Sequence, residues 1–257
     1  TGLVGSEMCI RDRGKVSSVR RTRRFWFERY RWGIVGPGRL MVGGRDARGN
    51  DAVVKKHLST GDLYLHADLH GAASCALKRV DGLELGGDEE IVSEGVCNFR
   101  IVQSIDGAPE DLQMLSEDEK EEAAALAACW SRAWGAGSAA ATAFHVRPSQ
   151  VSKATESGEA LGRGSFVVRG NRGWHRDLVL KMAIGLGTVN GIPMPVPGSV
   201  SAIGNLCDRW VEITPGREKK EDVARRISKA TGLDHGEVLA ALPSGNCDLI
   251  DHGLLKA

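Results

Sequence analysis

The run DLYLHADLH (residues 62–70) decides the fold class, because its polar and apolar residues alternate without a break. Successive side chains of an extended strand point to opposite faces of the sheet. One face would carry leucine and alanine, and the other would carry Asp62, Tyr64, His66, Asp68 and His70. This alternation predicts a half-buried β-strand with one polar face.

The polar face also raises the alternative of a metal-dependent hydrolase or nuclease, since imidazoles and carboxylates are metal ligands. Its ligands would be Asp62, His66, Asp68 and His70. On a straight strand these side chains spread over about 13 Å, too far for all of them to reach one ion. The chain offers no second His/Asp cluster, no Cys pair, and neither a P-loop nor a dinucleotide-binding glycine pattern. We therefore expect no catalytic residue, no metal and no cofactor.

Segments around this strand extend the picture of a mixed sheet. Residues 32–46 predict a hairpin that turns at 36–38, and residues 52–58 predict a short helix or strand. Further strands are expected at residues 74–80, 96–102, 142–148, 165–170 and 208–216. The result is an α/β (α+β) domain with a mixed β-sheet, a long packing helix and a small C-terminal α/β appendage.

Helix signals are strongest at two places. Ser116 and Glu119 form a capping-box pattern before a helix expected over 117–134, whose apolar stripe includes Leu126 and Trp130. Residues 217–232 predict an amphipathic helix that Gly232 ends. Asp234 predicts the start of a second short helix. A proline-containing segment, 191–200, predicts a domain boundary or a rigid loop.

Composition restricts the class of protein and names no partner. The chain has 257 residues, 42% hydrophobic and 26% charged, with a net charge of +1, as in a soluble globular protein. Its six cysteines are scattered, which favours reduced thiols and a cytoplasmic location. No apolar run reaches the roughly 18 residues that cross a bilayer, so no membrane association is expected.

Charge is distributed unevenly. Residues 20–32 hold six arginines and five aromatic residues, types that contact phosphates and stack on bases. A strand with inward aromatic and outward arginine side chains is the alternative. Between 131 and 181 basic residues outnumber acidic ones by eight to three. They either line one basic surface or are scattered solvated charges, and they include Lys153, Arg163, Arg169, Arg172 and Arg176.

The segment 81–122 has the opposite character, with fourteen acidic residues and two basic ones. We interpret 81–115 as an acidic surface insertion that points away from any RNA-binding face. This insertion or the C-terminal helices would be the surfaces of a protein-interaction module, a function compatible with RNA binding. Residues 1–13 look like translated adaptor sequence, so we predict neither a fold nor a function for them.

Four segments in order resemble the RNA-binding domain (NFACT-R) of the NFACT family. They are GGRDARGND (43–51), GDLYLHADLHGAAS (61–74), ACWSRAW (128–134) and VRPSQVSKATESGEALGRGSFVVRG (146–170). The tail from residue 210 is similar to the C-terminal segment of archaeal-type members. The resemblance implies an RNA-binding domain over 14–185 and a C-terminal segment over 186–257. It also implies a fragment, because the family's N-terminal domain and coiled coil have no counterpart here.

The resemblance implies a role in ribosome-associated quality control, without catalysis. Family members bind large ribosomal subunits that carry an obstructed nascent chain, and they support its C-terminal tailing. The expected partners are the large ribosomal subunit, tRNA or rRNA, and other quality-control proteins. The candidate RNA contacts are Arg24, Arg29, Arg31, Arg45, Asp46, Asn50, Lys55, Asp62, His66, Asp68, His70, Ser74, Gln150, Ser152, Lys153 and Arg169. Ser157 and Gly158 also match the family motif.

Overall fold

The computed structural model describes residues 24–36, 39–79, 97–99, 114–155, 161–189 and 192–255, with only the backbone of 97–99. Eleven strands form a single mixed sheet. They are β1 (Arg31–Ile34), β2 (Arg39–Gly43), β3 (Leu63–Ala67), β4 (Cys75–Arg79), β5 (Cys97–Phe99), β6 (Ala140–Val146), β9 (Gly173–Val179), β10 (Met182–Val189), β11 (Ile192–Gly198), β12 (Trp210–Glu218) and β13 (Cys247–His252). The expectations for 1–13, Ser157 and Gly158, and nearly all of 81–115, lie outside the described residues.

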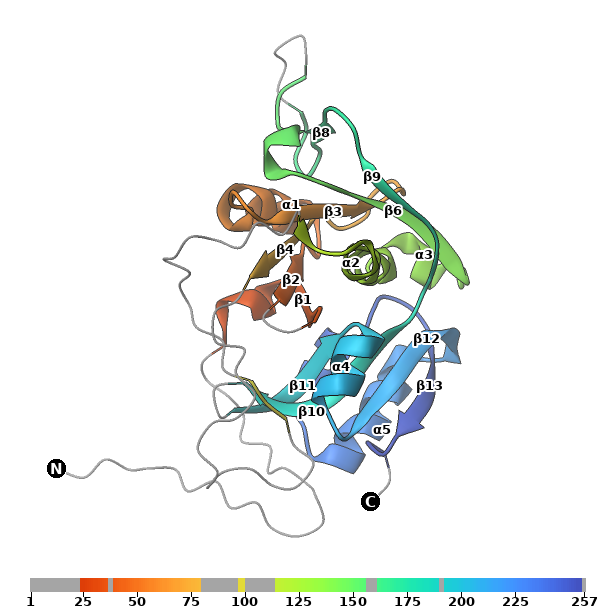
Figure 1. Cartoon of the computed structure of the whole chain (residues 1–257). Coiled ribbons are helices and arrows are strands. Elements are labelled where there is room, and N and C mark those ends of the chain that lie inside the picture. Colours follow the sequence, from red (N-terminus) through yellow and green to blue (C-terminus); the bar gives the residue numbers. More distant parts are fainter. Residues whose placement is uncertain are drawn as a thin grey trace, which may run out of the picture.

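The sheet curls on itself. Its strand order is β13-β12-β10-β11-β1-β2-β4-β3-β6-β9, and β5 pairs with β10. β9 lies at one end of this order, yet it leads into β10, near the other end, after only two residues. The two ends of the sheet must therefore approach each other, as Figure 1 shows. Neighbouring strands are antiparallel, except that β1 pairs with β11, and β5 with β10, in parallel.

Helix α2 (Glu117–Cys129) lies inside this curl. Figure 1 shows it nearly end-on, with β1, β2 and β4 on one side and β6 and β9 on the other. Its buried surface is mostly alanine (Ala123, Ala124, Ala127 and Ala128). Small side chains allow strands to come close on several sides. The expected cap is confirmed: Ser116 Oγ accepts from the Glu119 backbone N–H in a capping box.

The expected single helix over 117–134 is interrupted. α2 ends at Cys129, and α3 (Arg132–Gly135) begins after a break at Trp130 and Ser131. Ser131 caps the new helix by accepting from the Ala133 backbone N–H. A hydroxyl that competes for backbone donors favours a helix start over a helix interior.

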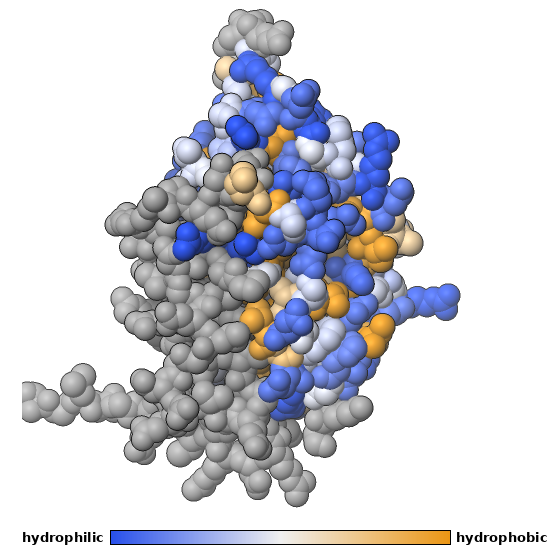
Figure 2. Space-filling view, viewed as in Figure 1, coloured by the Kyte–Doolittle hydropathy of each residue, from blue (hydrophilic) through white to orange (hydrophobic). Residues whose placement is uncertain are grey.

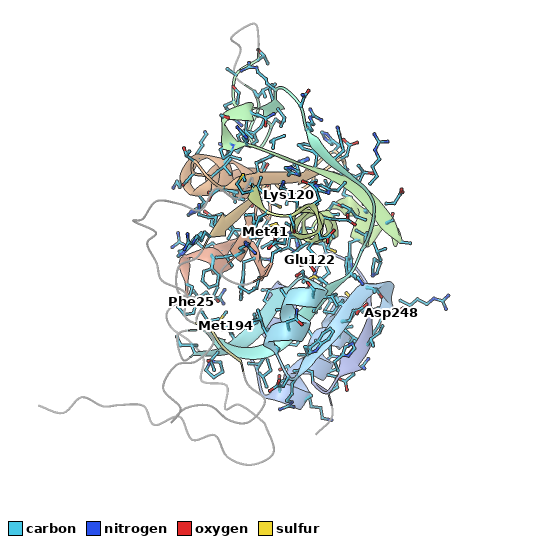
Figure 3. All side chains as sticks on the ribbon, viewed as in Figure 1. Phe25, Met41, Lys120, Glu122, Met194 and Asp248 are labelled. Atoms are coloured by element: carbon cyan, nitrogen blue, oxygen red, sulfur yellow. The ribbon has the colours of Figure 1, made fainter. Side chains whose placement is uncertain are left out.

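Two large hydrophobic clusters fill the fold. The first joins α2 to β2, β3, β4, β6 and β10, and the second lies among β1, β2, β11 and α4 (Val200–Leu206). Figure 3 places Met41 of the first cluster near α2 and Met194 of the second on β11. On the face seen in Figure 2, hydrophobic residues form small groups among hydrophilic ones. Among the described residues, no helix is both long and apolar enough to cross a membrane.

The prediction of a strand within 62–70 is confirmed. The prediction that its polar face is exposed to solvent is wrong at the N-terminal end of the strand. β3 covers only Leu63–Ala67, and Asp62 and Tyr64 are 5% and 2% exposed. Tyr64 packs in a third small cluster with Phe144 and Val146 of β6. β3 is an interior strand between β4 and β6, and η2 (Val53–His57) contributes Val54 to the cover on its polar face. Asp68, Leu69 and His70 follow the strand in a turn.

The arginine- and aromatic-rich segment is not a strand until Arg31. Residues Trp26–Arg29 form the 3-10 helix η1, and β1 follows. Phe27, Tyr30 and Trp32 are buried, so the aromatic side chains of this segment serve largely as core. The polar residues after β2 begin helix α1 (Ala47–Ala52), which Asp46 caps.

The proline-containing segment 191–200 is a strand and not a loop. β11 (Ile192–Gly198) pairs with β10 along its whole length. The C-terminal elements β12, α5 (Lys220–Thr231), α6 (His235–Ala241) and β13 continue the same sheet. Residue 185, where we divided the chain, lies inside β10, so the domain division stays a prediction. The mixed α/β fold is confirmed, as are the Gly232 and Asp234 caps.

We expect Gly43→Ala to destabilise the fold by about 1–3 kcal/mol, the usual cost of overpacking. A Cβ at Gly43 would lie 2.8 Å from Trp130 Cε3 and 3.0 Å from Cys75 Sγ. Urea unfolding would measure the loss. Gly162→Ala is the control, because a Cβ there meets nothing within 4 Å. Equal unfolding midpoints for both variants would contradict close packing of Trp130 against β2.

We expect the stability of the protein to fall as the pH drops from about 6.5 towards 4. His145 Nδ1 and His175 Nε2 lie 2.8 Å apart across β6 and β9. Burial, then the neighbouring His175, lowers the pKa of His145 from 6.5 to about 4. The unfolded chain therefore takes up protons first, so the contribution is complete above pH 6.5 and is lost below it. Urea unfolding at several pH values should show a shallower dependence in His145→Gln; an unchanged dependence would contradict this.

Candidate nucleic-acid interface

A cavity of about 600 Å³ opens beside the end of β3. Its walls are α1, the turn after β3, the break after α2 and the loop around Gly164. Half of the sixteen predicted contacts line it: Arg31, Arg45, Asp46, Asn50, His66, Asp68, His70 and Ser74. These residues come from three separate stretches of the sequence, and the fold brings them to one place.

The other predicted contacts do not line the cavity: Arg24, Arg29, Lys55, Asp62, Gln150, Ser152, Lys153 and Arg169. Asp62 is the clearest correction. Its carboxylate is buried and pairs with Lys78 Nζ at 2.5 Å, and burial raises its pKa. It therefore cannot join His66 in a shared ligand set. Within the described ranges, no group of three or more His, Cys, Asp or Glu side chains is placed to hold a metal ion.

Asn50 and Asp46 line the cavity, but their side chains are hydrogen-bonded to backbone groups of its walls. Asn50 Oδ1 accepts from the Ser74 backbone N–H at 2.9 Å, and its Nδ2 donates to the Ala72 carbonyl at 3.3 Å. Asp46 Oδ1 accepts from the Gly49 backbone N–H at 2.7 Å as the cap of α1. Both side chains therefore fix the shape of the walls.

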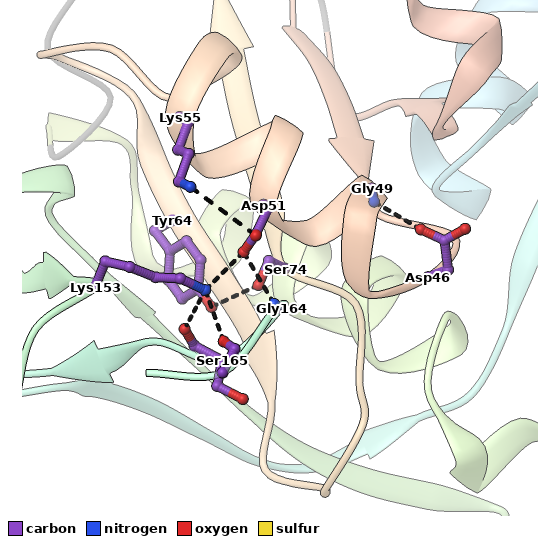
Figure 4. Close-up of polar contacts among 10 residues, drawn as sticks. Asp46, Gly49, Asp51, Lys55, Tyr64, Ser74, Lys153, Gly164 and Ser165 are labelled. Atoms are coloured by element: carbon purple, nitrogen blue, oxygen red, sulfur yellow. Dashed lines mark hydrogen bonds and ion pairs between the residues drawn. The ribbon is translucent and has the colours of Figure 1, made fainter. Parts of the chain in front are cut away.

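Lys153 and Asp51 together bind the loop 162–165, and we call this set of contacts the clasp (Figure 4). Lys153 Nζ lies 2.8 Å from Asp51 Oδ1 and donates to the carbonyls of Gly162 (2.8 Å) and Ser165 (3.0 Å). Asp51 Oδ1 also accepts from the Gly164 backbone N–H at 2.9 Å. The hydrogen bond from Lys153 holds the pKa of Asp51 below its ordinary value. The clasp ties the loop that carries Arg163 and Phe166 to helix α1, so Lys153 is not a free cation.

Gln150, Ser152 and Arg169 order a small separate sheet of β7 (Val151–Ser152) and β8 (Val167–Val168). Gln150 Nε2 donates to the carbonyls of Arg169 and Asn171, and Arg169 Nη2 donates to the carbonyl of Ala154. A 3-10 turn, η4 (Pro148–Gln150), leads directly into β7.

Four arginines give the cavity its charge: Arg31, Arg45, Arg163 and Arg172. Arg31 Nη2 donates to Ser244 Oγ at 2.7 Å, and Arg45 Nη2 donates to the Ala240 carbonyl at 3.2 Å. Burial lowers the pKa of Arg45, and the nearby charges of Arg31 and Arg24 lower it further. Among the described residues, no carboxylate forms an ion pair with any of these four arginines.

Aromatic side chains also line the cavity. The rings of Tyr64 and His66 lie parallel with centroids 6.3 Å apart, and Phe144 lies 5.8 Å from His66. The Arg172 guanidinium lies 4.6 Å from the centre of the Phe144 ring. Burial lowers the pKa of His66, so its ring is neutral at pH 7. We did not anticipate Phe144 or Phe166 as site residues, because each sits in a strand-like pattern typical of a core.

We expect both Asp51→Asn and Lys153→Met to weaken RNA binding about 3- to 10-fold, because either change opens the clasp. If Asp51→Asn acted only by removing a negative charge, it would strengthen binding to a polyanion. Weaker binding therefore indicates loss of the clasp, and stronger binding indicates a charge effect alone. Filter binding of tRNA would measure affinity, and Asp118→Asn, an exposed acid on α2, is the control. Tighter binding by Asp51→Asn than by Asp118→Asn would contradict the role of the clasp.

Comparison with known proteins identifies the family of this chain. Residues 24–170 match the family model described as the NFACT protein RNA binding domain. The archaeal Rqc2 homolog aRqcH of Methanocaldococcus jannaschii is 29% identical over 233 residues, 90% of this chain and 30% of that protein. The mouse ribosome quality control complex subunit NEMF is 33% identical over 168 residues, 65% of this chain and 13% of that protein.

The chain spans less than a third of the length of these curated relatives. Among solved structures, the C-terminal part of the fibronectin/fibrinogen-binding protein from Streptococcus suis is 18% identical with a TM-score of 0.38. That match covers 62% of this chain and 49% of the other. Because the family model covers more than half of its residues, the chain belongs to the NFACT family and contains the family's RNA-binding domain.

Proposed function

We propose that this chain is the RNA-binding part of a ribosome-associated quality-control factor. It would bind tRNA or rRNA on obstructed large ribosomal subunits in the cytoplasm and support rescue of the stalled nascent chain with C-terminal tailing. The observation that supports this proposal is the cavity, which is lined by four arginines that have no carboxylate partner among the described residues. Three of its relatives bear names from ribosome quality control.

The charge arrangement supports an anionic partner. Among the described residues, two acidic ones, Asp46 and Asp68, line the cavity, and one oxygen of Asp46 already caps α1. Arginine is suited to phosphate because its planar fork offers five N–H donors. Aromatic side chains beside these arginines suit unstacked bases, the usual targets of sequence-reading RNA-binding proteins.

Other quality-control proteins are proposed as further partners. The proposal needs no catalysis by this chain. The alternative of a hydrolase required Asp62 together with His66, and the buried Asp62–Lys78 pair removes that ligand.

We expect Arg45→Ala/Arg172→Ala to weaken tRNA binding at least tenfold and to lower the salt slope of the binding constant. Each lost phosphate contact removes about one unit from that slope. Filter binding from 50 to 200 mM salt would measure both quantities. Arg217→Ala is the control, because Arg217 is exposed and lies in the C-terminal elements.

Co-sedimentation with large subunits that carry peptidyl-tRNA would test the ribosomal part of the proposal. The wild type should sediment with obstructed subunits more than with empty ones, and the double variant should not. If the double variant and Arg217→Ala behave alike in both assays, the cavity is not the RNA site.

A further inference from the structure

The aromatic wall of the cavity continues to the protein surface. The Phe144 and Trp174 rings meet edge to face with centroids 5.3 Å apart, and Arg172 lies 5.5 Å from the Trp174 ring. Trp174, on β9, is 42% exposed, which is unusual for so large an apolar ring. The rings of Tyr64, His66, Phe144 and Trp174 thus form a continuous path from the cavity floor to solvent.

The floor of the cavity offers specific hydrogen-bonding groups. Tyr64 Oη and Ser74 Oγ lie 3.0 Å apart, and both residues are almost fully buried while lining the cavity. Either hydroxyl can donate to the other, so one of the two hydrogens remains available to a ligand acceptor. The neutral His66 ring stands beside them. Buried polar groups of this kind discriminate between ligands because leaving them unpaired is costly.

The size and charge of the cavity limit its occupant. About 600 Å³ falls within the roughly 300–1,000 Å³ of small-ligand pockets and cannot admit a double helix. Arg31 and Arg45 stand near each other, because burial and then the charge of Arg31 lower the pKa of Arg45, and Arg172 stands among the rings. A ligand with one flat aromatic part and one anionic part would contact both the rings and the arginines.

We propose that this cavity receives one unpaired nucleotide of a bound RNA. Its base packs along the rings of His66, Phe144 and Trp174, and its phosphates lie against Arg31 and Arg45. The Tyr64–Ser74 hydroxyl pair reads an acceptor on the base edge. This inference rests on the proposed function and adds to it that the RNA is bound through an unstacked base.

Trp174→Ala provides the main test, because Trp174 is on the edge strand and its truncation leaves the core intact. Fluorescence anisotropy would compare a short single-stranded RNA with a blunt duplex of the same sequence. Wild type should favour the single strand at least tenfold. Loss of base stacking in Trp174→Ala should weaken single-strand binding about 5- to 100-fold. The salt slope should stay unchanged, because no phosphate contact is lost.

Two further variants make the result specific. Tyr64→Phe removes only the hydroxyl and should cost about 2- to 10-fold in single-strand affinity. Val179→Ala, 58% exposed on the same strand, is the matched control and should bind like wild type. Adenosine monophosphate serves as a competitor, and it should compete only weakly because it lacks the neighbouring phosphates.

Three outcomes would overturn the nucleotide pocket. They are equal affinity for single strand and duplex, equal affinity of Trp174→Ala and Val179→Ala, and no competition by adenosine monophosphate even in large excess. The first two leave RNA binding intact if Arg45→Ala/Arg172→Ala still weakens binding. Absence of any RNA binding by the wild type would instead refute the proposed function.

Discussion

Burial of the alanine-rich helix α2 inside the curled sheet is the interaction on which the remaining structure depends. Its small side chains let strands pack against it from several sides, and Leu126 reaches Gly33 of β1 so closely that a Cβ there would lie 3.1 Å from its Cδ2. Curling around α2 brings β9 to β10 and thus joins the first and last parts of the sheet. The helix also ends at the cavity, where Trp130 lines the wall against Gly43.

The polar residues around the cavity divide by the number of partners they already have. Asn50 is hydrogen-bonded to backbone groups, and Lys153 is bonded to backbone carbonyls and to Asp51. Both side chains therefore hold the walls of the cavity in place. Within the described part of the chain, the side chains of Arg31 and Arg45 each donate one hydrogen bond, although a guanidinium has five N–H donors. The arginines and rings are therefore the proposed ligand contacts, while Asn50 and Lys153 hold the walls that carry them.

Features set by neighbouring residues could be predicted from the sequence. Burial of a side chain by residues distant in the sequence could not. The Ser116, Gly232 and Asp234 caps involve groups within a few residues, so the sequence alone indicates them. Alternation predicted β3, but the groups that bury Tyr64 come from β6 and η2. Similarly, we expected Lys153 in contact with RNA, because nothing local marks Asp51 as its partner.

The prolines of β11 show the same limit. They occupy every second position (Pro193, Pro195 and Pro197), so all three lack an N–H on one edge of the strand. The alternate residues serve the antiparallel ladder with β10, and among the described residues the opposite edge pairs with β1 at Gly198 alone. Three prolines therefore fit a strand whose other edge is nearly unpaired, a condition that the sequence does not reveal. This strand joins the C-terminal elements to the sheet, and the end of α6 with the residues after it contacts two arginines of the cavity: the Ala240 carbonyl accepts from Arg45, and Ser244 Oγ accepts from Arg31. The carbonyl end of a helix carries partial negative charge and favours nearby cations, so residues beyond 170 help to position Arg31 and Arg45 at the cavity.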